Sequence, residues 1–452
     1  MRNRYLDLLR AAAIVRVIVY HLFGWPWLSI VFPAMGVMFA LAGSLTAASL
    51  SRRAAGQVVT SRLRRVLPPL WLLGVLAVPA MIGLGWAREQ DGTHPFTPWQ
   101  LVFWVLPLSD PPGSETGIDA WEPLWYIRAY VWFVLLSPVL WFLYRRMAGA
   151  GWLLVIAPIG AIVLLDKTGF ELPETADVVL WDLVTYGACW IAGFTHRDGR
   201  LGRLSPGAVL AIAAALGGLA LYWQRGHQGA DPWDLNDVSE SQALWSLAFV
   251  LVVLRFQPDM AWLSRFRLLD RAVTLLNARA VTVYLWHNLA IAALWPVLTY
   301  LALDDLGRAE MPVTLAVTFV LTGVAVVLFG WAEDLAANRR PRLWPSTGAP
   351  ARPVRDAPAP AGPVPAGWPE VARDGSPVNP VFTAHVPDQG SPEDARTASF
   401  APADMPVAGR PAPGHPSRGA RAGDARPPGQ HRPPHHPDTT APTRFPGPRD
   451  HS

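Results

Sequence analysis

Residues 6–24, LDLLRAAAIVRVIVYHLFG, decide the fold class of this chain. At about 1.5 Å per residue, a helix of this length crosses the roughly 30 Å hydrocarbon core of a bilayer. Three bases nevertheless interrupt the apolar run: Arg10, Arg16 and His21. Because ionisable side chains are costly inside a membrane, their presence in a span predicts a functional site.

Arg10 and His21 are predicted to lie on one face of this helix. At about 100° per residue, their spacing returns to nearly the same direction after three turns, roughly 16 Å further along the axis. The helix then presents a guanidinium near one membrane surface and an imidazole nearer the other, and we expect a cleft along this stripe. Arg16 lies off this face, in mid-membrane, where we expect it to pair with a carboxylate; Asp182 is the candidate partner.

The rest of the chain has the composition of a polytopic membrane protein. Of its 452 residues, 51% are hydrophobic, only 16% are charged, and 22 are Trp, which is too apolar for an ordinary soluble protein. The net charge of +4 does not indicate a nucleic-acid partner, because the basic residues lie in short loops between apolar runs. The single cysteine, Cys189, excludes an intrachain disulfide and a cysteine metal site, and no metal ligands are predicted.

Apolar runs of bilayer length predict an all-α fold with about ten transmembrane helices. Residues 98–108 are too short to cross and are expected to form an interfacial or re-entrant piece. The ten predicted spans are 6–24, 30–50, 66–86, 123–143, 152–166, 178–195, 207–223, 241–255, 278–301 and 312–333.

The distribution of arginine predicts the orientation of these spans. If the N-terminus is cytoplasmic, the loops on that side carry most of the arginines, and the opposite loops carry most of the acids. One missed or invented span would invert every later loop, so this agreement supports an even number. We therefore expect a multi-pass protein of the cell (plasma) membrane with both termini in the cytoplasm.

The composition changes after about Leu335. Of the 45 prolines, 26 lie from Pro341 onward, and such a segment buries too little apolar surface to offset the entropy lost on ordering. We predict a transmembrane domain at residues 1–334 and a Pro/Ala/Gly/Arg-rich disordered cytoplasmic tail at residues 335–452. A non-catalytic scaffold organised by the tail is an alternative; removing the residues after Leu335 would leave the activity of an enzyme intact.

Four motifs resemble those of the integral-membrane acyltransferase-3 family. The first is the spacing of Arg10 and His21, a basic residue and a histidine separated by ten residues. The second is MFALAGSL at 38–45, and the third is SRLRRVLPPLW at 61–71, with Arg62 and Arg65 in an R-x-x-R pattern. The fourth is YLWHNL at 284–289, and the resemblance covers about residues 5–333.

This resemblance implies a membrane O-acyltransferase with three chemical tasks. It would move an acyl group, most simply acetyl, from cytoplasmic acyl-CoA to a hydroxyl of an envelope carbohydrate or related glycoconjugate. Acetyl-CoA is then a co-substrate, and no permanently bound cofactor is expected. The reaction needs a base for the hydroxyl proton, cationic groups for the donor phosphates, and a site that excludes water.

His21 suits the first task, because imidazole titrates near neutral pH; it would act as general base or as a nucleophile that carries the acyl group. Arg10 would orient the donor, and Arg62 and Arg65, with Arg64 beside them, would bind its phosphates through their guanidinium forks. Positive-inside topology alone also explains arginines at this position.

Four further residues are candidates for binding the acceptor: Glu122, Trp125, Tyr126 and His287. The alternative roles are an interhelical hydrogen bond for His287, an interfacial aromatic belt for Trp125 and Tyr126, and a solvated loop carboxylate for Glu122. The chain also departs from the family pattern here. Arg128 stands where many relatives have Glu, which puts the acceptor in question.

A polytopic transporter or flippase is the alternative function, with Arg10, Arg16 and His21 lining a polar path. The absence of paired, Gly/Pro-broken helices in matching halves argues against it. Consumption of a thioester by the purified protein would separate the two functions.

Overall fold

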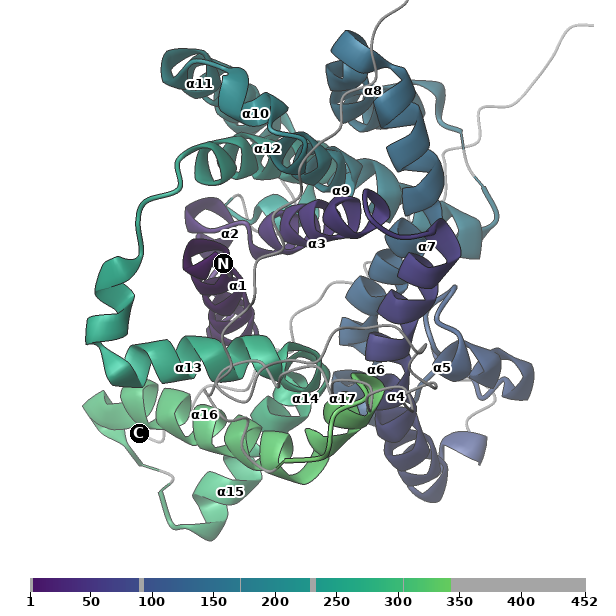
Figure 1. The fold of residues 1–452 in the computed structure, drawn as a ribbon. Coiled ribbons are helices and arrows are strands. Elements are labelled where there is room, and N and C mark those ends of the chain that lie inside the picture. Colours follow the sequence, from purple (N-terminus) through teal and green to yellow (C-terminus); the bar gives the residue numbers. More distant parts are fainter. Residues whose placement is uncertain (1–2, 89–92, 171, 228–232, 304, 343–452) are drawn as a thin grey trace, which may run out of the picture. The chain divides into compact units, whose positions relative to one another are not determined.

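A computed structural model describes residues 3–88, 93–170, 172–227, 233–303 and 305–342, in which the regular elements are α-helices and short 3-10 turns (Figure 1). The described residues belong to one unit, Met1–Ala349, and a second unit, Pro350–Ser452, lies outside them. The predicted disorder of the tail therefore falls almost entirely outside the described residues. The all-α prediction is confirmed for the part that is described.

The first predicted span is helix α1, Arg4–Phe23, and the sequence explains both of its ends. The Asn3 side chain caps the N-terminus by accepting hydrogen bonds from the backbone N–H groups of Tyr5 and Leu6. Gly24 ends the helix in the left-handed region at φ 62°, where glycine carries no steric cost. These caps fix the helix that carries Arg10 and His21.

Every predicted span contains a helix. The helices after α1 are α2 (Leu28–Val31), α3 (Ala34–Leu50), α4 (Ala55–Gly83), α5 (Val102–Val105), α6 (Ile118–Trp121), α7 (Trp125–Arg146), α8 (Gly151–Thr168), α9 (Glu174–Arg197), α10 (Arg200–Arg203), α11 (Pro206–Gly226), α12 (Ser239–Arg255), α13 (Arg267–Ala278), α14 (Ala280–Ala292), α15 (Leu294–Tyr300), α16 (Glu310–Phe329) and α17 (Trp331–Ala336).

Seven segments of the described chain are long and apolar enough to cross a membrane, or eight if the bent pair α14 and α15 forms one span. The bend between α14 and α15 is 50°. The two other predicted spans are α1, which carries several charges, and α12, which has 17 residues. Residues 98–108 hold only the 3-10 turn Pro98–Leu101 and α5, so their prediction as a piece too short to cross is confirmed.

The second motif brings two helices into close contact. A Cβ atom built on Gly43 of α3 would lie 2.2 Å from the backbone oxygen of Trp190 in α9. On the α9 side, a Cβ on Gly193 would lie 2.2 Å from the backbone oxygen of Ala40. Only glycine allows the two backbones to approach this closely, as small residues do between membrane helices generally. The glycine of the motif therefore serves helix packing.

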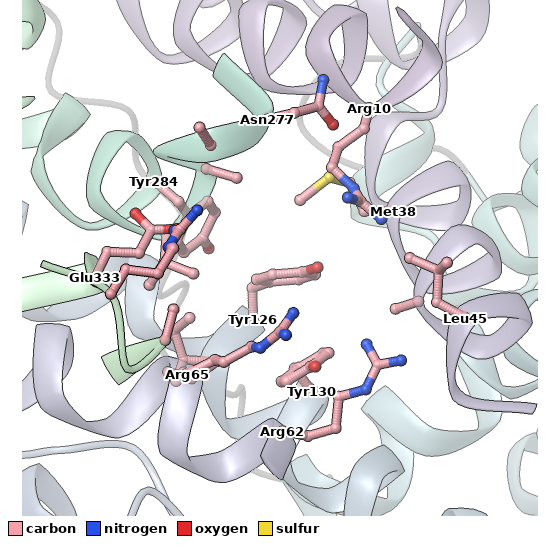
Figure 2. Close-up of a pocket in the computed structure, with 18 residues that line it drawn as sticks. Arg10, Met38, Leu45, Arg62, Arg65, Tyr126, Tyr130, Asn277, Tyr284 and Glu333 are labelled. Atoms are coloured by element: carbon pink, nitrogen blue, oxygen red, sulfur yellow. The ribbon is translucent and has the colours of Figure 1, made fainter. Parts of the chain in front are cut away.

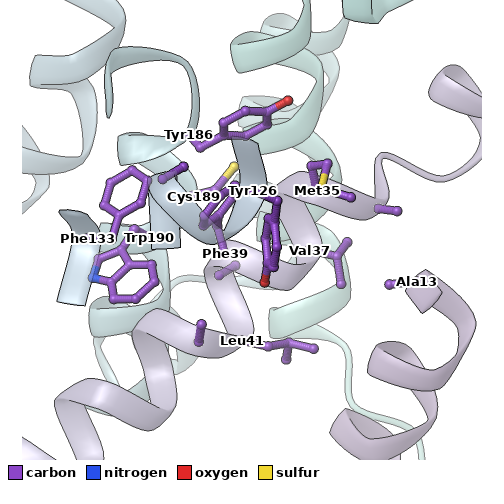
Figure 3. Close-up of a cluster of buried hydrophobic side chains, with 14 of the residues drawn as sticks. Ala13, Met35, Val37, Phe39, Leu41, Tyr126, Phe133, Tyr186, Cys189 and Trp190 are labelled. Carbon is purple, nitrogen blue, oxygen red and sulfur yellow. The ribbon is translucent and has the colours of Figure 1, made fainter. Parts of the chain in front are cut away.

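Aromatic rings fill the core beside this contact (Figure 3). The ring of Phe39 lies 4.9 Å from that of Tyr126, 5.2 Å from that of Phe133 and 4.9 Å from that of Tyr186, measured between centroids. Edge and tilted contacts at such distances are favourable for aromatic rings. The aromatic core thus packs against Tyr126 and fixes the position of its ring.

The C-terminal helices pack on the other side of α1 from α3 (Figure 1). At the start of α1, Arg4 forms an ion pair with Asp270 of α13, and Asn277 Nδ2 donates to the backbone oxygen of Asp7 at 2.7 Å. The α17 helix packs against α4. This arrangement brings residues from both ends of the described chain beside Arg10.

Candidate active site

A cavity of about 430 Å³ opens between α1, α3, α4, α7, α13, α14 and α17. Four predicted site residues line it: Arg10, Arg62, Arg65 and Tyr126. Figure 2 shows the three guanidinium groups pointing into the same opening, Arg10 from α1 and both Arg62 and Arg65 from α4. Its volume lies within the range of small-molecule binding sites, roughly 300–1,000 Å³. The fold therefore brings the arginine of the first motif and the two arginines of the third motif to a single site.

Three of the four arginines that line the cavity, Arg10, Arg62 and Arg65, form no ion pair with the residues that the structure describes; the fourth, Arg339, pairs with Asp334. The nearest polar contact of Arg62 is to Ser49 Oγ, at 3.5 Å. Like charges gathered around one small space repel one another until an anion binds between them. Guanidinium forks match the geometry of phosphate oxygens. The cavity is therefore suited to a phosphate-bearing ligand.

Arg64 does not belong to this cavity. It is exposed, forms a hydrogen bond to Asn338 Oδ1 and lines a second groove, to which Arg65 also contributes. Residues three apart share a helix face and their immediate neighbours do not, which explains why Arg62 and Arg65 point together and Arg64 points elsewhere. The R-x-x-R spacing thus identifies the two arginines that meet Arg10.

Glu333 is a cavity residue that the sequence did not indicate. Its Oε2 atom accepts hydrogen bonds from the hydroxyl of Thr282 at 2.9 Å and from the Thr282 backbone N–H at 3.3 Å. Burial raises the pKa of this carboxyl to about 7. In its protonated form Glu333 adds no negative charge to oppose a bound anion. Only the packing of α17 against α14 and α4 brings it there.

The segment after α17 also completes the cavity wall, through Ala337 and Arg339. It is held by Arg279, whose guanidinium bonds the Asp334 carboxylate at 2.6 Å and the Arg342 backbone oxygen at 2.7 Å. Removal of all residues after Leu335 would therefore damage the cavity, so that cut does not separate an enzyme from a scaffold. The cut must fall beyond Arg342.

His21 lies outside the cavity lining. It is exposed, and its ring contacts are Tyr20 of α1, at 5.6 Å between centroids, and His287 of α14, at 5.2 Å. Between Arg10 and His21 on the same stripe, Ile14 and Val17 are buried at 3% and 4% exposure. The expected open cleft along α1 is therefore wrong for the described conformation, because α14 packs against Ile14 and the main core, to which α3 contributes, buries Val17.

Tyr284 lies between the cavity and the His21–His287 pair. Like Glu333, it was not among the site residues predicted from the sequence. It lines the cavity with its ring 5.0 Å from that of Tyr126, and on its other side the ring of His287 lies at 5.6 Å. Its hydroxyl donates to the backbone oxygen of Pro123. The signal was present in YLWH, because Tyr284 and His287 are three apart and share a helix face.

The candidate acceptor residues are not gathered at one place. Tyr126 lines the cavity, whereas the ring of Trp125 stacks on Tyr186 at 5.8 Å, Glu122 is exposed, and His287 lies beside His21. The sequence pattern therefore grouped side chains that the fold directs to different surroundings.

The expected pairing of Arg16 with Asp182 is wrong. Asp182 instead bonds Arg128, with 2.6 Å between Nη2 and Oδ2, and Arg128 also pairs with Asp110. Arg16 donates to the backbone oxygen of Leu28 at 3.3 Å and lies over the ring of Tyr20, 4.6 Å from its centroid. Arg128, which stands where many relatives have Glu, is thus paired with two carboxylates of this chain, Asp110 and Asp182.

Comparison with known families gives one match. The family model described as an acyltransferase domain, Acyl_transf_3, matches residues 3–332. This range includes α1 to α16 and all of the cavity residues from Arg10 to Tyr284. No curated protein and no solved structure matches the chain.

Proposed function

Because the chain belongs to the acyltransferase-3 family and is a multi-pass membrane acyltransferase, we propose that it transfers an acetyl group from cytoplasmic acetyl-CoA to a hydroxyl of an envelope carbohydrate. The observation that carries this proposal is the convergence of Arg10, Arg62 and Arg65 on one cavity, without carboxylate partners in the described chain.

The cavity arginines receive the phosphates of the donor. Acetyl-CoA carries several phosphates, and each guanidinium offers two parallel N–H groups to a pair of oxygens. Arginine-rich mouths face the cytoplasm in most membrane proteins, which is where acyl-CoA is found. Arg10 and the α4 pair hold the head of the donor, and its pantetheine arm extends into the protein.

His21 serves as the base at the far end of the arm. It removes the proton from the acceptor hydroxyl while the oxygen attacks the thioester carbonyl; the C–O bond forms, the C–S bond breaks, and the proton passes to the leaving thiolate. Arg10 and His21 are roughly 16 Å apart along the helix. The arm passes Tyr126 and Tyr284, and α14 moves away from α1 at Ile14 when the donor binds.

The test is acetyl transfer by the isolated protein in lipid nanodiscs, with acetyl-CoA labelled in the acetyl group and envelope glycan as acceptor. We expect labelled glycan and release of free CoA thiol from the native protein, and neither from His21→Ala. The matched control is His227→Ala, because His227 is an exposed histidine stacked on Trp223 at the end of α11. It should keep full activity.

Two outcomes contradict the proposal. The first is full transfer by His21→Ala. The second is a native protein that moves glycan or lipid across the membrane without consuming the thioester, which would indicate a flippase.

A further inference from the structure

His287 has one ring nitrogen in use and one free. The side chain is buried, at 1% exposure, and Nδ1 lies 2.6 Å from the backbone oxygen of Tyr284. A carbonyl oxygen only accepts hydrogen bonds, so Nδ1 must carry the proton and donate it. In a neutral imidazole, the lone pair is then on Nε2. The helix carbonyl therefore fixes the tautomer of His287.

Nε2 of His287 is buried and has no hydrogen-bond partner among the residues that the structure describes. Buried polar atoms almost always have a partner, and leaving one without a partner costs free energy. The neighbouring tyrosine cannot supply it, because the hydroxyl of Tyr284 already donates to Pro123. The free atom of the adjacent Asn288 is Oδ1, which is itself an acceptor. The donor that Nε2 requires must come from a bound water, from another side chain or from a substrate.

The ring of His21 lies beside that of His287, without a hydrogen bond to Nε2 in the described conformation. The two imidazole centroids are 5.2 Å apart, and the ring planes meet at 64°, so the edge of one ring approaches the other. His21 has a donor in either neutral tautomer. An N–H of His21 directed at Nε2 would satisfy the unpartnered atom.

We propose that His287 is a positioning residue for His21: its Nε2 accepts an N–H from His21 and so leaves the other nitrogen of His21 unprotonated toward the acceptor hydroxyl. This inference rests on the proposed function, in which His21 is the base. When His21 takes the hydroxyl proton, the resulting imidazolium keeps its hydrogen bond to Nε2. His287 itself touches no substrate atom.

Two substitutions separate this role from a structural one. His287→Asn keeps an N–H group where Nδ1 was, and so keeps the bond to the Tyr284 carbonyl, but it loses the acceptor at Nε2. His287→Gln places an oxygen acceptor near the position of Nε2 and gives up the bond to the carbonyl. A structural role predicts that Asn is tolerated better than Gln, and positioning of His21 predicts the reverse.

We expect His287→Asn to lower kcat by about a hundredfold, the lower end of what acid–base catalysis contributes, with the KM for acetyl-CoA unchanged. His287→Gln should retain at least about a tenth of the native kcat. The matched control is His227→Asn, since Nδ1 of His227 also lies against a helix carbonyl, that of Trp223, at 3.1 Å. It should leave kcat unchanged.

Nitrogen-15 spectra of histidine-labelled protein test the contact without an activity measurement. The His21 signals, assigned by their loss in His21→Ala, should shift in His287→Asn and stay in place in His227→Asn. Unmoved His21 signals, or an Asn variant more active than the Gln variant, would overturn the inference. These two results are distinct from full activity in His21→Ala. That third result would overturn the proposed function, and this inference with it.

Discussion

Two groups of arginines in this protein differ in how the charge is matched. Arg128 and Arg279 are buried, at 2% and 1% exposure, and both bond carboxylates: Arg128 pairs with Asp110 and Asp182, and Arg279 pairs with Asp334. Arg10, Arg62 and Arg65 of the cavity are more exposed and have no carboxylate partner in the described chain. Arginine thus occurs in this protein both paired with a carboxylate and without a carboxylate partner in the described chain.

This difference distinguishes arginines that stabilise the fold from arginines that bind a ligand. A buried charge without a partner is too costly to keep, so arginines that hold helices together come with carboxylates. Arginines that must receive an anion gain nothing from a permanent carboxylate, because the ligand would have to displace it. The comparison predicts that substitutions in the first group lower stability, whereas those in the second lower donor affinity.

The largest effect is expected for Arg279→Met. It removes the nearer of the two arginine partners of the buried Asp334 carboxylate, at 2.6 Å against 3.4 Å for Arg339, and the bond to the Gly330 backbone oxygen at 2.7 Å. Breaking one side of a buried pair costs about 3–5 kcal/mol. Thermal unfolding in detergent should show a large fall in Tm, and Asp334→Asn in the same background should restore part of it. An unchanged Tm would contradict the prediction that the paired arginines stabilise the fold.

The next effect is on the donor. Arg65→Ala should raise the KM for acetyl-CoA about tenfold or more and leave Tm in place, because a hydrogen bond to a charged group contributes about 1.5–3 kcal/mol. Arg64→Ala is the matched control from the same helix turn, and we expect it to change KM less than about twofold. Equal effects of the two substitutions would show that the cavity is not the donor site.

A smaller, pH-dependent effect is expected at Glu333, the carboxylate of the cavity lining. Its pKa is raised to about 7 by burial, so in the folded protein it stays protonated at pH values where the unfolded chain has already lost the proton. The free energy of unfolding therefore falls as pH rises from about 4.5 to about 7 and is level above that. Glu333→Gln should raise Tm at pH 8 and leave it nearly unchanged at pH 5.

The same carboxylate should act on donor binding. Above pH 7 its negative charge opposes the phosphates next to Arg10, Arg62, Arg65 and Arg339. The KM of the native protein should rise about fivefold between pH 6 and pH 8, which corresponds to roughly 1 kcal/mol, and that of Glu333→Gln should stay level. Parallel pH profiles for the two proteins would contradict this assignment.

The smallest effect is expected for removal of residues 346–452. The cut leaves the cavity wall at Ala337 and Arg339, together with the Arg279 contacts that hold it. Transfer activity should change less than about twofold, the difference that a surface change of about 0.4 kcal/mol would give. Removal after Leu335 should abolish it. Loss of activity in the protein that lacks only residues 346–452 would favour the scaffold alternative.

Several features of the site could be predicted from local spacing alone. Arg62 and Arg65 share a helix face because they are three residues apart, and the helix period excluded Arg64 from that face. The length and apolarity of the segments predicted the membrane helices, because the thickness of the bilayer sets a requirement that each segment meets by itself. Tyr284 was predictable in the same way from its spacing to His287.

Other features depended on contacts between distant segments. Neither the place of Glu333 in the cavity nor the choice of Arg128 over Arg16 as the partner of Asp182 is encoded in a local period. Local spacing also failed along α1, where Ile14 and Val17 are covered by other helices although the stripe itself was placed correctly.

By itself, the sequence determined which segments form helices and which side chains share one face of a helix, because these follow from the period and length of a single segment. The tertiary structure alone decided which faces meet: that Arg10 shares a cavity with Arg62 and Arg65, and that His21 meets His287. The reason is that a helix period fixes directions around one axis, whereas the distance between two axes depends on how side chains pack.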